Sequence, residues 1–158
     1  QDQCATIKRQ LCLLLHGVSV FLDVDDLKDI AALETYVDQT AVIMIFVSQG
    51  YFQSKNCLRE ARCTIKKGKP IALVHDEAVY LKNYMPLEAI KKDECPAELL
   101  GPIFDGRTVI GWHRIQDFQR VSLKLLAEEV LRGCPDPPQD PRIYIQGELQ
   151  MKQKRPKM

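Results

Sequence analysis

An excess of charge of one sign and long apolar runs are both missing from this sequence. Lys and Arg number 22 and Asp and Glu 21 among 158 residues, so the net charge at pH 7 is +1. A chain with this balance has no general positive field to attract nucleic acid or an anionic membrane surface. The longest apolar run, residues 41–47, is far shorter than the roughly 20 residues of a spanning helix. We therefore expect a cytoplasmic protein that binds neither nucleic acid nor membrane.

The ligand spacing of a zinc site is also missing. None of the six cysteines forms a CxxC pair, and the three histidines do not stand at ligand spacing with them. The chain is long enough to bury a core without disulfides, which favours reduced thiols. An acidic stretch beginning at Asp23 imitates a calcium loop, but Leu27 and Lys28 occupy positions that require an oxygen ligand and a Gly. We predict no metal site and no cofactor.

Helical and strand patterns alternate along the chain. Short β-branched or apolar runs predict strands at residues 18–23, 41–48, 70–76 and 108–112. Helical spacing predicts helices before Gly17, from a cap at Asp29 to about Thr40, and over residues 57–68, 86–92, 96–104 and 115–133. In the last helix, the residues predicted to face the core are Phe118, Val121, Leu125 and Leu126. The alternation predicts an α/β fold with a mainly parallel sheet.

The member of that class that fits best is flavodoxin-like, a three-layer fold whose parallel sheet has the strand order 2-1-3-4-5. In this order the first strand is central, and here it would precede Gln1. We therefore expect a fragment that lacks the central strand, with segments 18–23 and 41–48 on either side of a gap. Residues 1–134 form the expected domain, and residues 135–158, Pro-rich and then basic, an expected mobile tail.

Four stretches follow one another in a recognisable order: VFLDVDDLKDI, AVIMIFVSQGYFQSKNCLREA, PIALVHD and VIGWHRIQDFQRVSL. A strand ends in Asp23, a second strand ends in Ser48, and a loop with Tyr51 leads into a helix that opens with Cys57-Leu58-Arg59-Glu60. This order resembles the Toll/interleukin-1 receptor homology (TIR) domain. The resemblance covers most of residues 18–125 and implies a signalling module with the flavodoxin-like fold.

By this resemblance, Glu60 corresponds to the glutamate with which catalytic TIR domains cleave NAD between nicotinamide and ribose upon self-association. Its position agrees, because ligands of open parallel sheets bind at the carboxyl ends of strands, and Glu60 follows the loop that leaves strand 41–48. The predicted buried stripe of its helix consists of Cys57, Leu58, Ala61 and Ile65. Glu60 lies on the flank of that stripe. The competing interpretation is a solvated acid favoured by the helix dipole, worth about 0.3–1 kcal/mol.

The resemblance also implies a second function, a non-enzymatic adaptor that acts by binding other TIR domains. The acidic loop with Asp25 and Asp26 resembles a surface that the family uses for such contacts, and the alternative is a solvated loop. Both functions use the same fold, so composition does not separate them.

Two other chemistries fit the sequence less well. A thiol nucleophile at Cys57 would need a base such as His75, but the apolar stripe favours a buried structural cysteine. A phosphoacceptor receiver has the same topology and needs an Asp where this chain has Val47 and Ser48.

Overall fold

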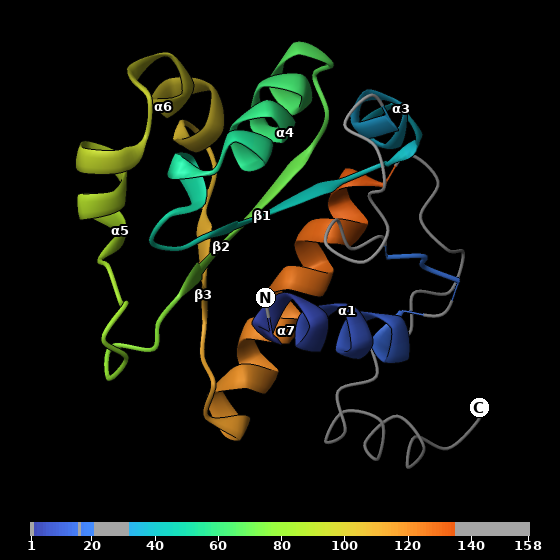
Figure 1. Cartoon of the computed structure of the whole chain (residues 1–158). Helices are drawn as coiled ribbons and strands as arrows, with labels where there is room; N and C mark the ends of the chain where they lie inside the picture. Colours follow the sequence, from blue (N-terminus) through green and yellow to red (C-terminus); the bar gives the residue numbers. More distant parts are fainter. Residues whose placement is uncertain (1, 16, 21–31, 135–158) are drawn as a thin grey trace.

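In the computed structural model, which describes residues 2–15, 17–20 and 32–134, the chain folds as a parallel sheet flanked by helices (Figure 1). The strands are β1 (Ile43–Val47), β2 (Ile71–Asp76) and β3 (Val109–Trp112). Both neighbouring pairs are parallel, and β2 lies in the middle. Parallel neighbours need long crossover connections, and helices supply them here. The predicted α/β class with a parallel sheet is confirmed.

Helices cover both faces of this sheet. They are α1 (Asp2–Leu14), α3 (Ala32–Gln39), α4 (Lys55–Lys66), α5 (Leu87–Ala89), α6 (Ala97–Phe104) and α7 (Gln116–Gly133). A 3-10 turn covers Tyr51–Gln53 and a π-helical turn covers Ile90–Glu94. α1 and α7 pack on one face, and α3, α4 and α6 on the other (Figure 1). Within the described residues, none of the helices has the length and apolar character that crossing a bilayer demands.

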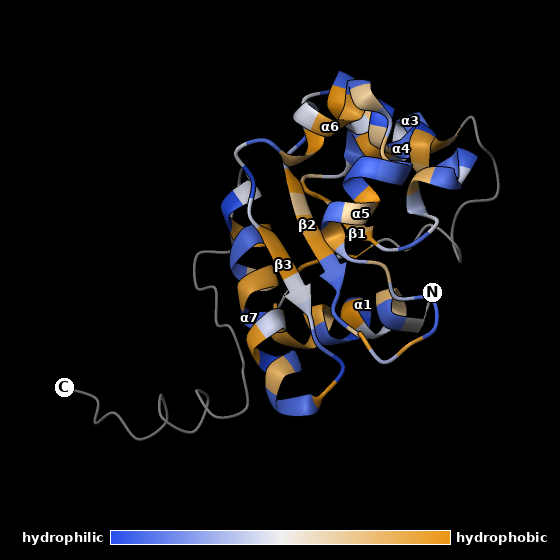
Figure 2. Cartoon of the chain, turned by 90° about the vertical axis from the view of Figure 1, so that its left-hand side faces the viewer, coloured by the Kyte–Doolittle hydropathy of each residue, from blue (hydrophilic) through white to orange (hydrophobic). Residues whose placement is uncertain are grey.

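Side chains of the central strand alternate between two cores. Leu73 packs with Ile45 and Val47 of β1 on the α4 and α6 side. Ala72 and Val74 pack on the α1 and α7 side, and all five side chains are almost completely buried. A strand covered on both faces is apolar at every position, and β2 is orange along most of its length in Figure 2. Its polar residues gather at its carboxyl end, which is blue in the same view.

One predicted strand is not found where the structure tests it. Residues 18–20 of the predicted strand 18–23 have no regular structure, and the other three lie outside the described residues. β1 therefore has a neighbouring strand on only one of its edges within the described part of the chain. The order β1-β2-β3 matches the last three strands of a flavodoxin-like sheet. The sheet is compatible with that fold, and the central strand beside β1 stays a prediction.

The predicted inner face of α7 is wrong for three of its four residues. The exposed ones are Phe118, Val121 and Leu125, at 57%, 57% and 45%. Leu126 is buried as predicted. Ser122 is also buried, which was not predicted because its side chain is polar. The Ser122 hydroxyl donates to the carbonyl of Gly111 in β3 at 2.5 Å.

α7 ends in close contact with the segments that lead into β1 and β2. A Cβ atom at Gly133 would lie 2.6 Å from Val42 Cγ2 and 3.0 Å from Pro70 Cβ. Only a residue without a side chain permits this approach.

Candidate active site at the carboxyl end of the sheet

The loop between β1 and α4 is fixed at both of its ends. Gly50 has φ of 85°, a left-handed conformation that glycine adopts without steric cost. The Gly50 amide donates to Glu94 Oε2 at 2.9 Å, which ties the loop to the segment before α6. At the other end, Ser54 Oγ caps α4 by accepting from the amide of Cys57 at 3.4 Å. These contacts position the first turns of α4 at the carboxyl end of β1.

Glu60 lies on the side of α4 that faces the protein. At about 100° per residue, its neighbours around the helix are Cys63 on one side and Thr64 on the other. These two residues are 8% and 0% exposed, and Glu60 itself is half-buried. The Glu60 carbonyl accepts from Thr64 Oγ1 at 2.7 Å. A fully solvated acid does not describe this position.

The predicted buried stripe of α4 is correct only in part. Ala61 is completely buried. The half-buried members of the stripe are Cys57, Leu58 and Ile65. Cys63 and Thr64 are buried instead, because α3 packs against the side of α4 that carries Cys63. Burial raises the pKa of the Cys63 thiol, and Glu34 and Asp38 of α3 raise it further. The burial of Thr64 costs little, since its hydroxyl bonds to the helix backbone.

The first turns of α1 share an electrostatic neighbourhood with Glu60. Burial raises the pKa of the Cys4 thiol, and the Cys57 thiol and the Glu60 carboxylate raise it further. Such effects need proximity, because charges near a protein surface are screened beyond about 10 Å at ordinary salt. The same part of α1 is held to the sheet by Trp112, whose Nε1 donates to Gln3 Oε1 at 2.8 Å. The Glu60 carboxylate of α4 therefore contributes to the raised pKa of the Cys4 thiol in α1, and both side chains are half-buried.

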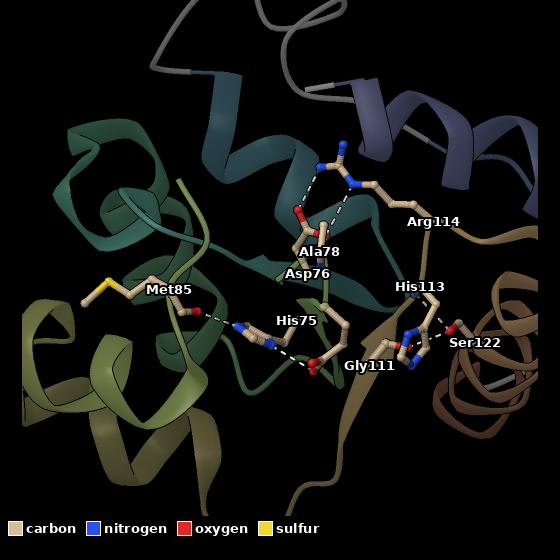
Figure 3. Close-up of polar contacts among 9 residues, drawn as sticks. His75, Asp76, Ala78, Met85, Gly111, His113, Arg114 and Ser122 are labelled. Atoms are coloured by element: carbon tan, nitrogen blue, oxygen red, sulfur yellow. Dashed lines mark hydrogen bonds and ion pairs between the residues drawn. The ribbon is translucent and has the colours of Figure 1, made fainter. Parts of the chain in front are cut away.

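A second group of polar residues lies where β2 and β3 end (Figure 3). The buried His75 ring faces an oxygen at each nitrogen, with Nε2 2.9 Å from the Met85 carbonyl and Nδ1 2.9 Å from Glu77 Oε1. Next to it, Arg114 Nη2 forms an ion pair with Asp76 Oδ2 at 2.8 Å. Because both of its ring nitrogens have these partners, His75 does not serve as the base for a thiol nucleophile of α4.

The remaining predicted site residues, Asp25 and Asp26, lie outside the described residues. The sequence analysis missed Glu94 and Cys4, because their partners lie far away in the chain: Glu94 accepts from the Gly50 amide, and the pKa of Cys4 responds to Glu60. For Cys4 there was a signal, because it stands three residues before Ile7 on the buried face of α1. In the described part of the chain, no group of three or more His, Cys, Asp or Glu side chains is arranged to hold a metal ion.

Comparison with known proteins assigns no family to this arrangement. No protein-family model matches the chain, and neither curated proteins nor solved structures gave a match. The candidate function therefore depends on the residues and on their geometry.

Proposed function

We propose that this chain is a TIR signalling module that cleaves NAD at the bond between nicotinamide and ribose when copies of it associate. Glu60 is the catalytic carboxylate. The observation that carries the proposal is the half-buried place of Glu60 on the inner side of α4, at the carboxyl end of β1. Ligands of open α/β sheets bind at this edge. The TIR-like order of motifs supplies the substrate class.

The chemistry needs one well-placed negative charge. When the glycosidic bond breaks, its electron pair leaves with nicotinamide, which departs as a neutral ring, and positive charge develops on the ribose. A fixed carboxylate beside the ribose stabilises this charge, and it does so more strongly in a partly buried site than in water. Water then adds to the ribose carbon and releases a proton. Nicotinamide is already a good leaving group, so a second acid is not required.

The Cys4 thiol, whose pKa Glu60 helps to raise, is compatible with this role. The pKa of Cys4 is raised by burial and then by its neighbours, so the thiol stays protonated at neutral pH. A neutral thiol leaves the negative charge of this neighbourhood on the carboxylate. NAD is the substrate and no cofactor takes part, and the proposed activity belongs in the cytoplasm, where NAD is present.

The test compares two acids on neighbouring helices. Purified chain at high concentration is incubated with NAD, and nicotinamide release is followed by chromatography. Glu60→Gln keeps the shape and removes the charge, so we expect the rate to fall about 10²-fold or more, as for other electrostatic catalytic groups. Glu34→Gln, an exposed acid in the first turn of α3, is the matched control and should keep the wild-type rate. Equal rates for wild type and Glu60→Gln would remove Glu60 from catalysis.

The second candidate is a non-enzymatic adaptor that acts through TIR–TIR contacts. A row of exposed cations on the outer face of α4 favours it, because such a surface suits contact with another protein. This function predicts self-association with no release of nicotinamide, and the same assay therefore separates the two candidates.

A further inference from the structure

The ring of His75 lies between two groups that accept hydrogen bonds. Its Nε2 atom is 2.9 Å from the Met85 carbonyl oxygen, and its Nδ1 atom is 2.9 Å from Glu77 Oε1 (Figure 3). A carbonyl oxygen carries no proton, and a carboxylate carries none at neutral pH. A neutral imidazole has a single N–H group, so it satisfies only one of these two acceptors. Both bonds form when the ring carries a proton on each nitrogen.

The His75 ring is also closed off from water. His75 is 2% exposed, so water does not replace a missing partner at its ring. Tyr84 packs edge-on against the ring, with 5.9 Å between the two ring centroids. A buried cation is costly unless an opposite charge lies beside it, and the Glu77 carboxylate supplies that charge. The doubly protonated ring is therefore compensated in both charge and hydrogen bonding.

Glu77 reaches the ring across β3. In the register of the sheet, Gly111 of β3 lies beside His75. A Cβ atom at Gly111 would lie 3.0 Å from Glu77 Cγ and 3.3 Å from Glu77 Oε1. The side chain of Glu77 therefore occupies the space that a larger residue in this strand would need. The backbone of Glu77 is fixed separately, because its amide donates to the Trp112 carbonyl at 3.0 Å.

Other charged or titratable groups at this end of the sheet have partners of their own. Asp76 Oδ2 forms an ion pair with Arg114 at 2.8 Å. On the side of α5 and α6, the Glu94 carboxylate accepts from a backbone amide of the loop after β1. The His113 ring, which follows β3, packs against Phe118 of α7. The β1 residue in register with the buried ring is apolar.

We propose that His75 and Glu77 form a proton-controlled latch at the carboxyl end of the sheet. While both ring nitrogens carry a proton, Glu77 is held over Gly111. As the pH rises, the ring releases its Nδ1 proton to water and keeps the bond from Nε2 to the Met85 carbonyl, which the backbone holds in place. The Glu77 side chain is 32% exposed, so its carboxylate then turns to solvent, away from the lone pair on Nδ1.

The latch places a charge at the edge where ligands of open α/β sheets bind. In the protonated form the Glu77 carboxylate lies flat over β3, and in the deprotonated form it projects into solvent at the same edge. The latch uses none of the residues assigned to NAD cleavage, so it holds whether or not the chain has that activity.

The experiment is a pH titration of the full chain by nuclear magnetic resonance. Long-range proton–nitrogen spectra show which ring nitrogens carry a proton, and signals that vanish in His75→Gln belong to the buried ring. From about pH 5 to about pH 8, we expect the His75 ring to pass from two protonated nitrogens to Nε2 alone. The carboxyl carbon of Glu77 should shift with the same midpoint, because its bond to the ring breaks in the same step.

Two variants remove the latch in different ways. Glu77→Gln removes the charge and provides an amide that can donate to Nδ1, so the ring should hold its second proton at least about tenfold less tightly. Gly111→Ala displaces the Glu77 side chain and should change the ring in the same direction. The matched control is Glu88→Gln, the same chemical change at an exposed acid of α5, and its ring should titrate like that of the wild type.

The wild-type titration decides the question even if a substitution unfolds the chain. A His75 ring that keeps the same protonation over the whole range, with one proton or with two, would overturn the latch. The same holds for a Glu77 carboxyl shift that does not follow the ring, or for a folded Glu77→Gln variant whose ring titrates like wild type. Nicotinamide release plays no part in this measurement, so failure of the latch and failure of the NAD activity are distinguished.

Discussion

Gly133→Ala is expected to destabilise the fold by a predictable amount. The new Cβ would meet Val42 Cγ2 at 2.6 Å and Pro70 Cβ at 3.0 Å, distances that force α7 or the chain before β1 and β2 to move. Overpacking of this kind costs about 1–3 kcal/mol. For a domain of this size, a loss of about 2 kcal/mol lowers the melting temperature by roughly 4–8 °C. Differential scanning calorimetry measures this shift directly.

A second glycine supplies the control for this prediction. Gly101 lies inside α6 directly before Pro102, and a Cβ there would meet the side chain of Asp105 at 3.2 Å from Oδ2. The Asp105 carboxylate is exposed and can turn away, and the helix preference of alanine, about 0.5–1 kcal/mol, is opposed by crowding of the new Cβ against the ring of Pro102. Gly101→Ala should therefore lower the melting temperature less than Gly133→Ala does. A Gly133→Ala protein that melts at or above the wild-type temperature would refute the close approach of α7 to the segments before the strands.

Three further predictions concern the candidate site. Because the pKa of Cys4 is raised, its contribution to stability is present below the ordinary thiol pKa and is lost as the pH rises through the raised pKa. Glu60→Gln removes one cause of the raised pKa, so Cys4 should be alkylated faster at about pH 8. Peptide mass spectrometry measures this rate, and an unchanged rate would contradict the proximity of the two groups. Glu94→Ala removes the acceptor of the Gly50 amide, so hydrogen exchange of that amide should accelerate about tenfold, with Glu94→Gln closer to wild type. Trp112→Phe removes the donor to Gln3 and also leaves a space in the core, because Trp112 is completely buried. It should therefore cost more in urea unfolding than the roughly 1 kcal/mol of one hydrogen bond, and an unchanged stability would contradict the packing of α1 against β3.

The sheet and its helices were largely predictable from local patterns. The apolar run 41–48 and the segment 70–76 predicted β1 and β2 because strands covered on both faces have no polar alternation. The face of α7 was not predictable, since spacing alone does not reveal that Ser122 finds a backbone acceptor in β3. The predicted strand 18–23 has no regular structure at residues 18–20. Its β-branched content alone was a weak indication of a strand.

The candidate site was predictable in one residue but not in its surroundings. Helical spacing placed Glu60 at the flank of α4, although the depth of Cys63 depended on packing against α3. The electrostatic effect of Glu60 on Cys4 joins two helices far apart in the sequence, and no local pattern encodes it. The same holds for Glu94, which acts on a loop from the opposite end of a long connection.

The two opposite sides of α4 have a consequence for mixtures of defective copies. A subunit without the Glu60 charge still has its outer cations, and a subunit with reversed cations still has its acid. Under the proposed function, loss of turnover at Glu60 and loss of contacts at the outer cations should therefore arise from substitutions one or two positions apart along a single helix. If the proposed NAD cleavage requires association, copies without the acid would still associate through their outer cations, and they would lower the turnover of a mixture in proportion to their number.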